Sequence, residues 1–197
     1  MEPQTQKNFF QRNIGWIIPV AIIVLLGIWG IAQYNSFVSQ SEQITGQWAQ
    51  VQNQYQRRFD LIPNIVNTVK GVAKQEQDVF GAIATAREHY AGATTPDAKA
   101  TAAGEVESSL SRLLVIAENY PVLQSSQAYR DLIVELEGTE NRISVERMKY
   151  NDMVKTYNTS IKRFPTSLMA SLSGFSEHAY FDVPQAAQTA PVVNFTN

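Results

Sequence analysis

Few side chains in this sequence are of the types that perform catalysis or bind metal ions. There are two histidines, His89 and His178, and no cysteine. Neither histidine has further ligand-type residues at the spacing of a metal site, which favours solvated or structural histidines over metal ligands. Without cysteine, neither a disulfide framework nor thiolate chemistry is available. We therefore predict no metal site and no cofactor.

The acidic residues also lack an arrangement suited to catalysis. They are scattered at helical spacings, as on solvated helix faces, and form no pair for general acid–base chemistry. The H-E-x-x-H, G-x-S-x-G and glycine-rich phosphate-binding motifs do not occur in the sequence. The formal net charge of −2 and the pI near 5.7 provide no electrostatic basis for binding nucleic acid. We predict a protein that is not an enzyme and has no nucleic-acid partner.

Polar residues around a proline form the first group that could contact a partner. Asp60 and Asn64 are helical neighbours on either side of Pro63, and Arg57 lies one turn before Asp60. One interpretation is that they pair locally and satisfy backbone groups that Pro63 frees. The other is a polar contact with a partner subunit. The structural interpretation is favoured.

Two asparagines form the second group of candidate polar residues. Asn151 and Asn158 are one heptad apart, and each follows a tyrosine of an apolar seam. We expect them to cap or cross-link neighbouring helices by hydrogen bonds rather than to bind a ligand.

The elements that position these residues begin with an apolar run without charge, from Ile14 to Ala32. As a helix it would be roughly 28 Å long, close to the ~30 Å hydrocarbon core of a bilayer. Trp16 lies at one end, and Trp29 and Tyr34 lie at the other, where such rings suit the membrane interface. We predict a short N-terminal tail at 1–13 and a transmembrane helix at 14–33. A cleaved signal peptide is the alternative, but the apolar core is longer than such peptides have.

Flanking charge predicts the orientation of this helix. Lys7 and Arg12 precede the span, opposed by Glu2, and no Lys or Arg follows it until Arg57. The positive-inside rule then places the N-terminus in the cytoplasm and the main domain in the periplasm or outside the cell.

A heptad pattern follows the span and predicts one long helix that ends near Tyr90. Pro63 lies inside this pattern and is expected to kink the helix. Two seam positions carry the charged residues Arg58 and Glu76. The favoured interpretation is that both reach solvent while neighbouring apolar residues fill the seam; the alternative is a buried ion pair that sets the register. The apolar seam reads Ile44, Trp48, Val51, Tyr55, Ile62, Ile65, Val69, Val72, Val79 and Ile83, with Phe59 and Ala73 filling in.

Three further helices are predicted. One spans 96–119 with Thr95 as its N-cap, and one spans 126–163 after a loop at 120–126. The seam of the latter reads Tyr129, Leu132 or Ile133, Leu136, Thr139, Ile143, Glu146, Tyr150, Val154, Tyr157, Ile161 and Phe164. A short helix continues after Pro165 and ends at Gly174, and the aromatic residues at 175, 180 and 181 fold back. The fold is predicted to be all-α: an N-terminal transmembrane helix, then an elongated antiparallel bundle of three long helices plus a short fourth. The domain covers 34–183, and 184–197 is predicted to be a disordered tail.

These segments carry motifs that resemble the LemA family of bacterial single-span membrane proteins. They include Arg57-Arg58-Phe59-Asp60-Leu61-Ile62-Pro63-Asn64, Glu140-Asn141-Arg142-Ile143, and Tyr150-Asn151 with Val154 and Tyr157-Asn158. The resemblance covers about 34–183. It implies an elongated all-α fold in the bacterial inner membrane, without an established enzymatic activity or cofactor. Relatives are associated with membrane-bound metalloproteases of the HtpX type, and one lineage serves in building magnetosome membranes.

The sequence thus predicts a non-catalytic, membrane-anchored helical scaffold or adaptor. Self-assembly into a homo-oligomer is expected because the heptads are longer than an intrachain bundle must bury. Three alternatives stay open: a partner-specific regulator of a membrane-bound protease, a periplasmic sensor-like binding module, and an unrecognised enzyme that depends on residues such as Asp60 or Glu76.

Overall fold

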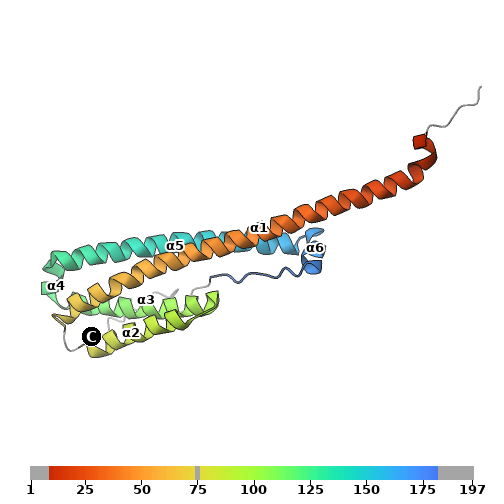
Figure 1. The fold of residues 1–197 in the computed structure, drawn as a ribbon. Coiled ribbons are helices and arrows are strands. Elements are labelled where there is room, and N and C mark those ends of the chain that lie inside the picture. The colour runs from red at the N-terminus through yellow and green to blue at the C-terminus, as the bar shows by residue number, and fades with distance from the viewer. Residues whose placement is uncertain (1–8, 74–75, 182–197) are drawn as a thin grey trace, which may run out of the picture. The chain divides into compact units, whose positions relative to one another are not determined.

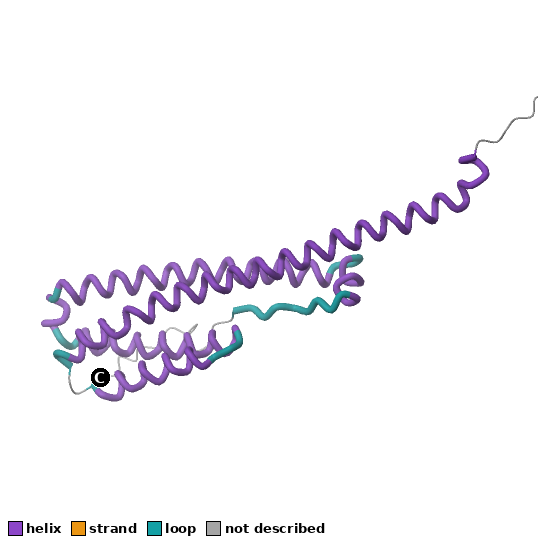
Figure 2. The backbone as a smooth tube through the Cα atoms, viewed as in Figure 1, coloured by secondary structure: helices purple, strands orange, loops and turns teal. Residues whose placement is uncertain are grey.

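Every regular element of this protein, in the ranges that its computed structural model describes (9–73 and 76–181), is a helix. The prediction of an all-α protein is therefore confirmed. Figures 1 and 2 show the helices in chain order. They are α1 (Phe9–Lys70), α2 (Gln77–Gly92), α3 (Pro96–Glu118), α4 (Pro121–Ser125), α5 (Gln127–Lys162) and α6 (Thr166–Leu172).

The chain divides into two compact units. The first comprises Met1–Glu42 and Tyr157–Glu177, and the second comprises Gln43–Thr156 and His178–Asn197. Helices α1 and α5 supply residues to both units. In the second unit, α1 and α5 run antiparallel, and α2 and α3 pack against each other as a helical hairpin (Figure 2).

The first helix runs through Pro63 without a break but ends earlier than predicted. It stops at Lys70, and the hydrogen bond from Gly71 N to Asn67 O, 3.1 Å, closes its last turn. The single helix predicted to reach Tyr90 is therefore wrong, because α2 begins only at Gln77. The heptad spacing continues in the sequence across the break, so it carries no sign that the chain turns. Val72, predicted to lie in the seam, is exposed.

Glu76 does not occupy a seam position. It is the half-buried N-cap residue of α2, and its side chain makes no capping hydrogen bond.

Most of the predicted apolar seam is buried in the structure. Trp48 is half-buried, and Phe164, predicted to end the seam of α5, is 78% exposed. The buried seam residues are Ile44, Val51, Tyr55, Ile62, Ile65, Val69, Ile83, Tyr129, Leu136, Ile143, Tyr150, Val154, Tyr157 and Ile161.

The helix ends follow local capping rules. Thr95 Oγ1 accepts a hydrogen bond from Ala98 N at 3.2 Å, and Pro96 occupies the first helical position, as predicted. Helix α6 ends in a Schellman motif, in which Gly174 has φ = +75° and Phe175 N donates to Ala170 O at 3.0 Å. A glycine tolerates this left-handed backbone because it has no Cβ.

Other boundaries and contacts differ in detail from the prediction. Helix α1 begins at Phe9, inside the predicted tail, and the predicted loop at 120–126 contains the short helix α4. Tyr180 is 44% exposed rather than folded back, whereas Phe181 is buried. The predicted tail at 184–197 lies outside the described residues.

We predict that Thr95→Ala lowers the free energy of unfolding by about 1 kcal/mol, because the first turn of α3 loses its side-chain cap. Thermal unfolding followed by circular dichroism measures the change. The exposed neighbour Thr94 provides the control, and Thr94→Ala should leave the midpoint unchanged. Equal effects of the two variants would contradict a capping role.

Candidate functional site

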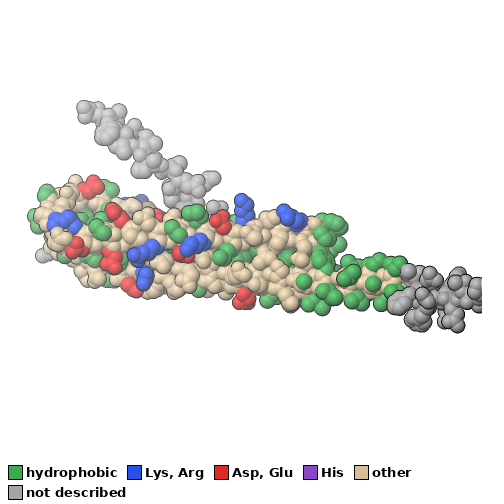
Figure 3. Space-filling view, turned by 90° about the horizontal axis from the view of Figure 1, so that it is seen from above, with side chains coloured by type: hydrophobic (Ala, Val, Ile, Leu, Met, Phe, Trp, Pro, Cys, Tyr) green, Lys and Arg blue, Asp and Glu red, His purple; other side chains and the backbone are tan. Residues whose placement is uncertain are grey.

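The most apolar surface of the described residues belongs to the N-terminal part of α1. The helical stretch Gly15–Lys70 is the one candidate membrane span among them, with a mean hydropathy of 2.3 in its most apolar window and 6% of that window buried. Trp16 is 80% exposed, Trp29 is half-buried and Tyr34 is exposed. Figure 3 shows hydrophobic side chains covering this part of the helix, with no acidic or basic side chain among them. By length and composition, this helix can cross a bilayer.

The polar residues around Pro63 form an exposed strip on α1. Arg57, Asp60 and Asn64 are all exposed. Asp60 Oδ1 accepts a hydrogen bond from Gln56 Nε2 at 2.8 Å, so its local partner is Gln56 rather than the expected Arg57. The backbone carbonyl of Asn64 accepts a hydrogen bond from Thr68 Oγ1 at 2.8 Å. The strip therefore presents two charges and an amide to solvent one helical turn apart.

Arg58 points the other way, into the helix packing. It is 7% exposed, and its guanidinium forms an ion pair with Glu140 of α5. The interpretation that Arg58 reaches solvent is therefore wrong. The buried Nε atom of Arg58 has no hydrogen-bond partner. A buried cation of this kind needs a nearby anion, because desolvation alone would be too costly.

A second carboxyl group joins this ion pair from α3. Burial raises the pKa of Glu107, and the negative charge of Glu140 and a hydrogen bond between the two carboxyls raise it further. The guanidinium groups of Arg58 and Arg147 act in the opposite direction. Beside them, burial raises the pKa of the Tyr55 phenol to about 12. Residues of α1, α3 and α5 thus meet in one polar cluster, which we call the Arg58 cluster (Tyr55, Arg58, Glu107, Glu140 and Arg147).

Glu107 was not among the residues singled out from the sequence. Its partners lie on two other helices, so no spacing along the chain indicates them. The position of Arg58 in an apolar seam was the one indication in the sequence that a carboxylate faces it from another helix.

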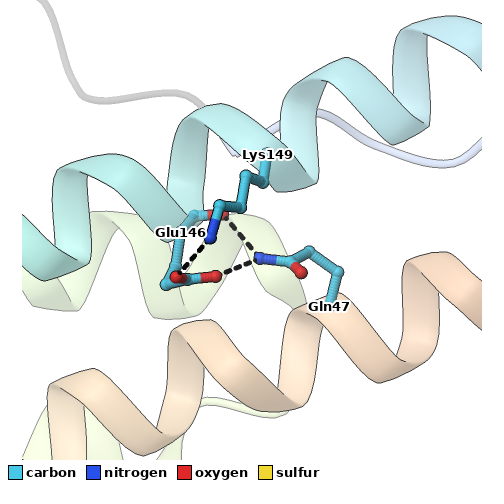
Figure 4. A network of polar contacts seen from close by, with 3 residues as sticks. All are labelled: Gln47, Glu146 and Lys149. Atoms are coloured by element: carbon cyan, nitrogen blue, oxygen red, sulfur yellow. Dashed lines mark hydrogen bonds and ion pairs between the residues drawn. The ribbon is translucent and has the colours of Figure 1, made fainter.

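A further polar network joins α1 to α5 in the second unit (Figure 4). Gln47 is 9% exposed, and its Nε2 donates to Glu146 Oε2 at 2.6 Å and to Glu146 O at 3.1 Å. Lys149 Nζ lies 2.8 Å from Glu146 Oε1. The hydrogen bonds from Lys149 and Gln47 lower the pKa of Glu146.

Asn151 holds the C-terminal segment of the second unit against α5. Its Nδ2 donates to Phe181 O at 3.0 Å, and its Oδ1 accepts from Phe181 N at 2.8 Å. Tyr150 Oη donates to Ala179 O at 3.0 Å. The Phe181 ring lies 5.6 Å from the Trp48 ring, with the guanidinium of Arg147 4.7 Å from its centre. The partner of Asn151 is thus an extended segment rather than a helix.

The remaining candidates do not assemble into a reaction centre. Asn158 is buried at 4% exposure. His89 Nδ1 lies 2.7 Å from Glu105 Oε2 on an exposed surface, and burial lowers the pKa of His178. In the part of the chain that the structure describes, no three His, Cys, Asp or Glu residues are grouped to hold a metal ion. Most of the side-chain contacts described for these polar groups are with other residues of the chain, in a neighbouring helix or in the segment at Phe181.

A comparison with protein families matches the model of the LemA family over residues 47–195. The chain belongs to the LemA family. The match starts later and ends later than the LemA resemblance read from the sequence. Together with the apolar helix, it identifies a membrane-associated protein.

The curated relatives of this LemA chain are magnetosome proteins. Magnetosome proteins MamQ 1 and MamQ 2 of Paramagnetospirillum magneticum are each 27% identical over 203 residues, which covers 90% of this chain and 74% of the relative. Magnetosome protein MamQ of Magnetospirillum gryphiswaldense is 26% identical over 189 residues, covering 83% of this chain and 69% of the relative.

We predict strong coupling between Arg58 and Glu140. In a double-mutant cycle with Arg58→Met and Glu140→Gln, the coupling energy should be about 1 to 3 kcal/mol, because either single change leaves its partner uncompensated. Chemical denaturation measures it. The exposed pair Lys162–Glu177, at 2.7 Å, serves as the control cycle and should couple by less than about 0.5 kcal/mol. Similar values for the two cycles would contradict a buried pair.

We predict that Glu107 makes stability depend on pH. The pKa of Glu107 in the folded chain lies above its ordinary 4.5, so the folded state binds this proton more tightly than the unfolded state. That contribution is fully present below pH 4.5 and is lost as the pH rises through the folded pKa. Glu107→Gln mimics the protonated group. The free energy of unfolding of this variant, relative to that of the wild type, should therefore increase as the pH rises above 4.5.

Thermal unfolding of both proteins across the pH range measures this difference. Glu88→Gln, at an exposed position of the neighbouring helix α2, is the control. A constant difference between wild type and Glu107→Gln at all pH values would contradict the raised pKa.

Proposed function

We propose that this LemA-family chain is a non-catalytic scaffold or adaptor, anchored by one transmembrane helix, that self-assembles at the membrane surface. The charge-free exposed face of α1 supports the anchor. In this proposal the N-terminus is cytoplasmic and the main domain is periplasmic, because Lys7 and Arg12 flank the span on one side only. The names of the MamQ relatives place those proteins in an organelle, which agrees with a structural role.

The observation that carries self-assembly is a second apolar stripe on α5, on the side opposite its buried seam. Val134, Val145 and Met148 are exposed by 68%, 44% and 59%. With Gly138 and Asn141 between them, they repeat at steps of four and three residues, as in a coiled-coil interface. Apart from the adjacent backbone of α5 itself, no described atom lies within 4 Å of where a Cβ of Gly138 would be, so packing among the described residues does not account for a glycine inside this helix.

The charges beside this stripe suit a parallel pairing of two copies. In the heptad set by the stripe, Glu137 and Arg142 occupy flanking positions five residues apart. This is the separation at which flanking residues of two parallel helices meet, so Glu137 of one copy would face Arg142 of the other. Asn141, in the centre of the stripe, would favour one register over others. The short stripe fits a reversible association rather than a permanent one.

The test is sedimentation of the detergent-solubilised full chain at micromolar concentration. The wild type should sediment as an oligomer, and the double variant Val134→Glu with Met148→Glu should shift to the monomer. Val115→Glu, on an equally exposed valine of α3, is the matched control and should leave the oligomer intact. A monomeric wild type would contradict self-assembly. If Val115→Glu lost the oligomer as fully as the double variant does, the stripe on α5 would not be the interface.

The exposed strip Arg57, Asp60 and Asn64 favours a second candidate, a regulator of a membrane-bound protease. A strip of two charges and an amide suits a polar contact with a different protein better than an apolar self-contact. A photocrosslinker at position 60 in intact membranes separates the two functions. Products that contain only this chain support the scaffold, and a reproducible heterologous product, lost in Arg57→Ala, supports the regulator.

A further inference from the structure

Helix α6 and the turn before it carry an apolar patch that the described residues of their unit leave exposed. Phe164, just before the helix, is 78% exposed, and Leu168 and Leu172 are 58% and 83% exposed. Leu168 and Leu172 are four residues apart and lie on one face of α6, and Phe164 lies in the turn that leads into the helix. Large apolar side chains grouped in this way usually mark a surface that is covered by a partner or a membrane.

Contacts on both sides of α6 hold it against the N-terminal part of α1 in the first unit. A Cβ on Gly30 would lie 3.3 Å from Met169 Cε, so the small residue permits close approach of the two helices. After the Schellman turn, the Phe175 ring lies 5.5 Å from the Tyr34 ring and 5.3 Å from the Phe37 ring. At the preceding end, the exposed ion pair Lys162–Glu177 joins the end of α5 to the same segment.

These contacts fix the level of α6 relative to the apolar span. Gly30 lies two residues before Ala32, the last residue of the charge-free run, which corresponds to about 3 Å along the helix. Tyr34 lies two residues after that end and is itself exposed. Of the residues that hold α6, Tyr34 is predicted to lie at the membrane interface, and Gly30 is next to Trp29, which is predicted there too.

We propose that the α6 patch, Phe164, Leu168 and Leu172, inserts into the interfacial region of the bilayer and forms a second membrane contact beside the span. The inference rests on the proposed transmembrane placement of α1. Continuity with the span favours lipid as the occupant, and three side chains are too few for a stable interface with a second copy. A span alone leaves rotation about its axis free, whereas a second contact to one side of it restricts both rotation and tilt.

The test uses site-directed spin labelling of the full chain in phospholipid nanodiscs. The sequence contains no cysteine, so single labels can be placed without removing native residues. Labels at Leu168→Cys and Leu172→Cys should be more accessible to oxygen, which partitions into lipid, than to a water-soluble nickel complex. Ser171→Cys, an exposed polar position about 100° around the helix from Leu172, is the matched control and should be more accessible to the nickel complex than Leu172 is.

Three outcomes would overturn the inference. The first is access of the nickel complex at Leu168 and Leu172 equal to that at Ser171. The second is spin–spin broadening at these sites, which would indicate a second copy as the occupant. The third is an aqueous environment at Val24→Cys inside the span, which would also remove the anchor itself. A lipid environment at Val24 with water at α6 would overturn this inference alone.

Discussion

The burial of one cation constrains how the second unit packs. Arg58 lies in the apolar seam of α1, where an uncompensated charge would be too costly, so a carboxylate must lie opposite. Glu140 of α5 provides it. Ten residues earlier on α1, Trp48 contacts Tyr150, which lies ten residues later on α5. The two antiparallel helices therefore keep one register between these points, and a slip would separate Arg58 from its partner.

This register explains the other polar contacts of the second unit. It brings Gln47 against Glu146. It also leaves the side-chain amide of Asn151 available to bond both the backbone N–H and the backbone carbonyl of Phe181. It also places Glu140 within hydrogen-bonding reach of Glu107 on α3, which helps to raise the pKa of Glu107. These contacts join α1, α3, α5 and the segment at Phe181 through polar side chains.

The same register determines which residues are left outside. Because an α-helix has a fixed angular period, burying one seam of α5 turns Val134, Val145 and Met148 to the opposite face. On α1 it turns Arg57, Asp60 and Asn64 outward. The features of this LemA chain that are available to partners are thus surfaces: an apolar span, an apolar stripe, an apolar patch on α6 and a polar strip.

Local patterns in the sequence determined the helical class, the apolar span, the seam from Ile44 to Val69, the Thr95 cap and the end of α6 at Gly174. Each depends on residues within one or two helical turns, so spacing alone specifies it. Only the tertiary structure decided that Arg58 is buried, that Glu107 joins its ion pair, and that Asn151 holds an extended segment. The structure alone also shows that α1 ends at Lys70, because the heptad spacing in the sequence continues past that residue. These outcomes depend on which helix lies opposite each residue. Contacts between residues far apart in the sequence do not produce a regular spacing of residue types, so the sequence pattern does not predict them.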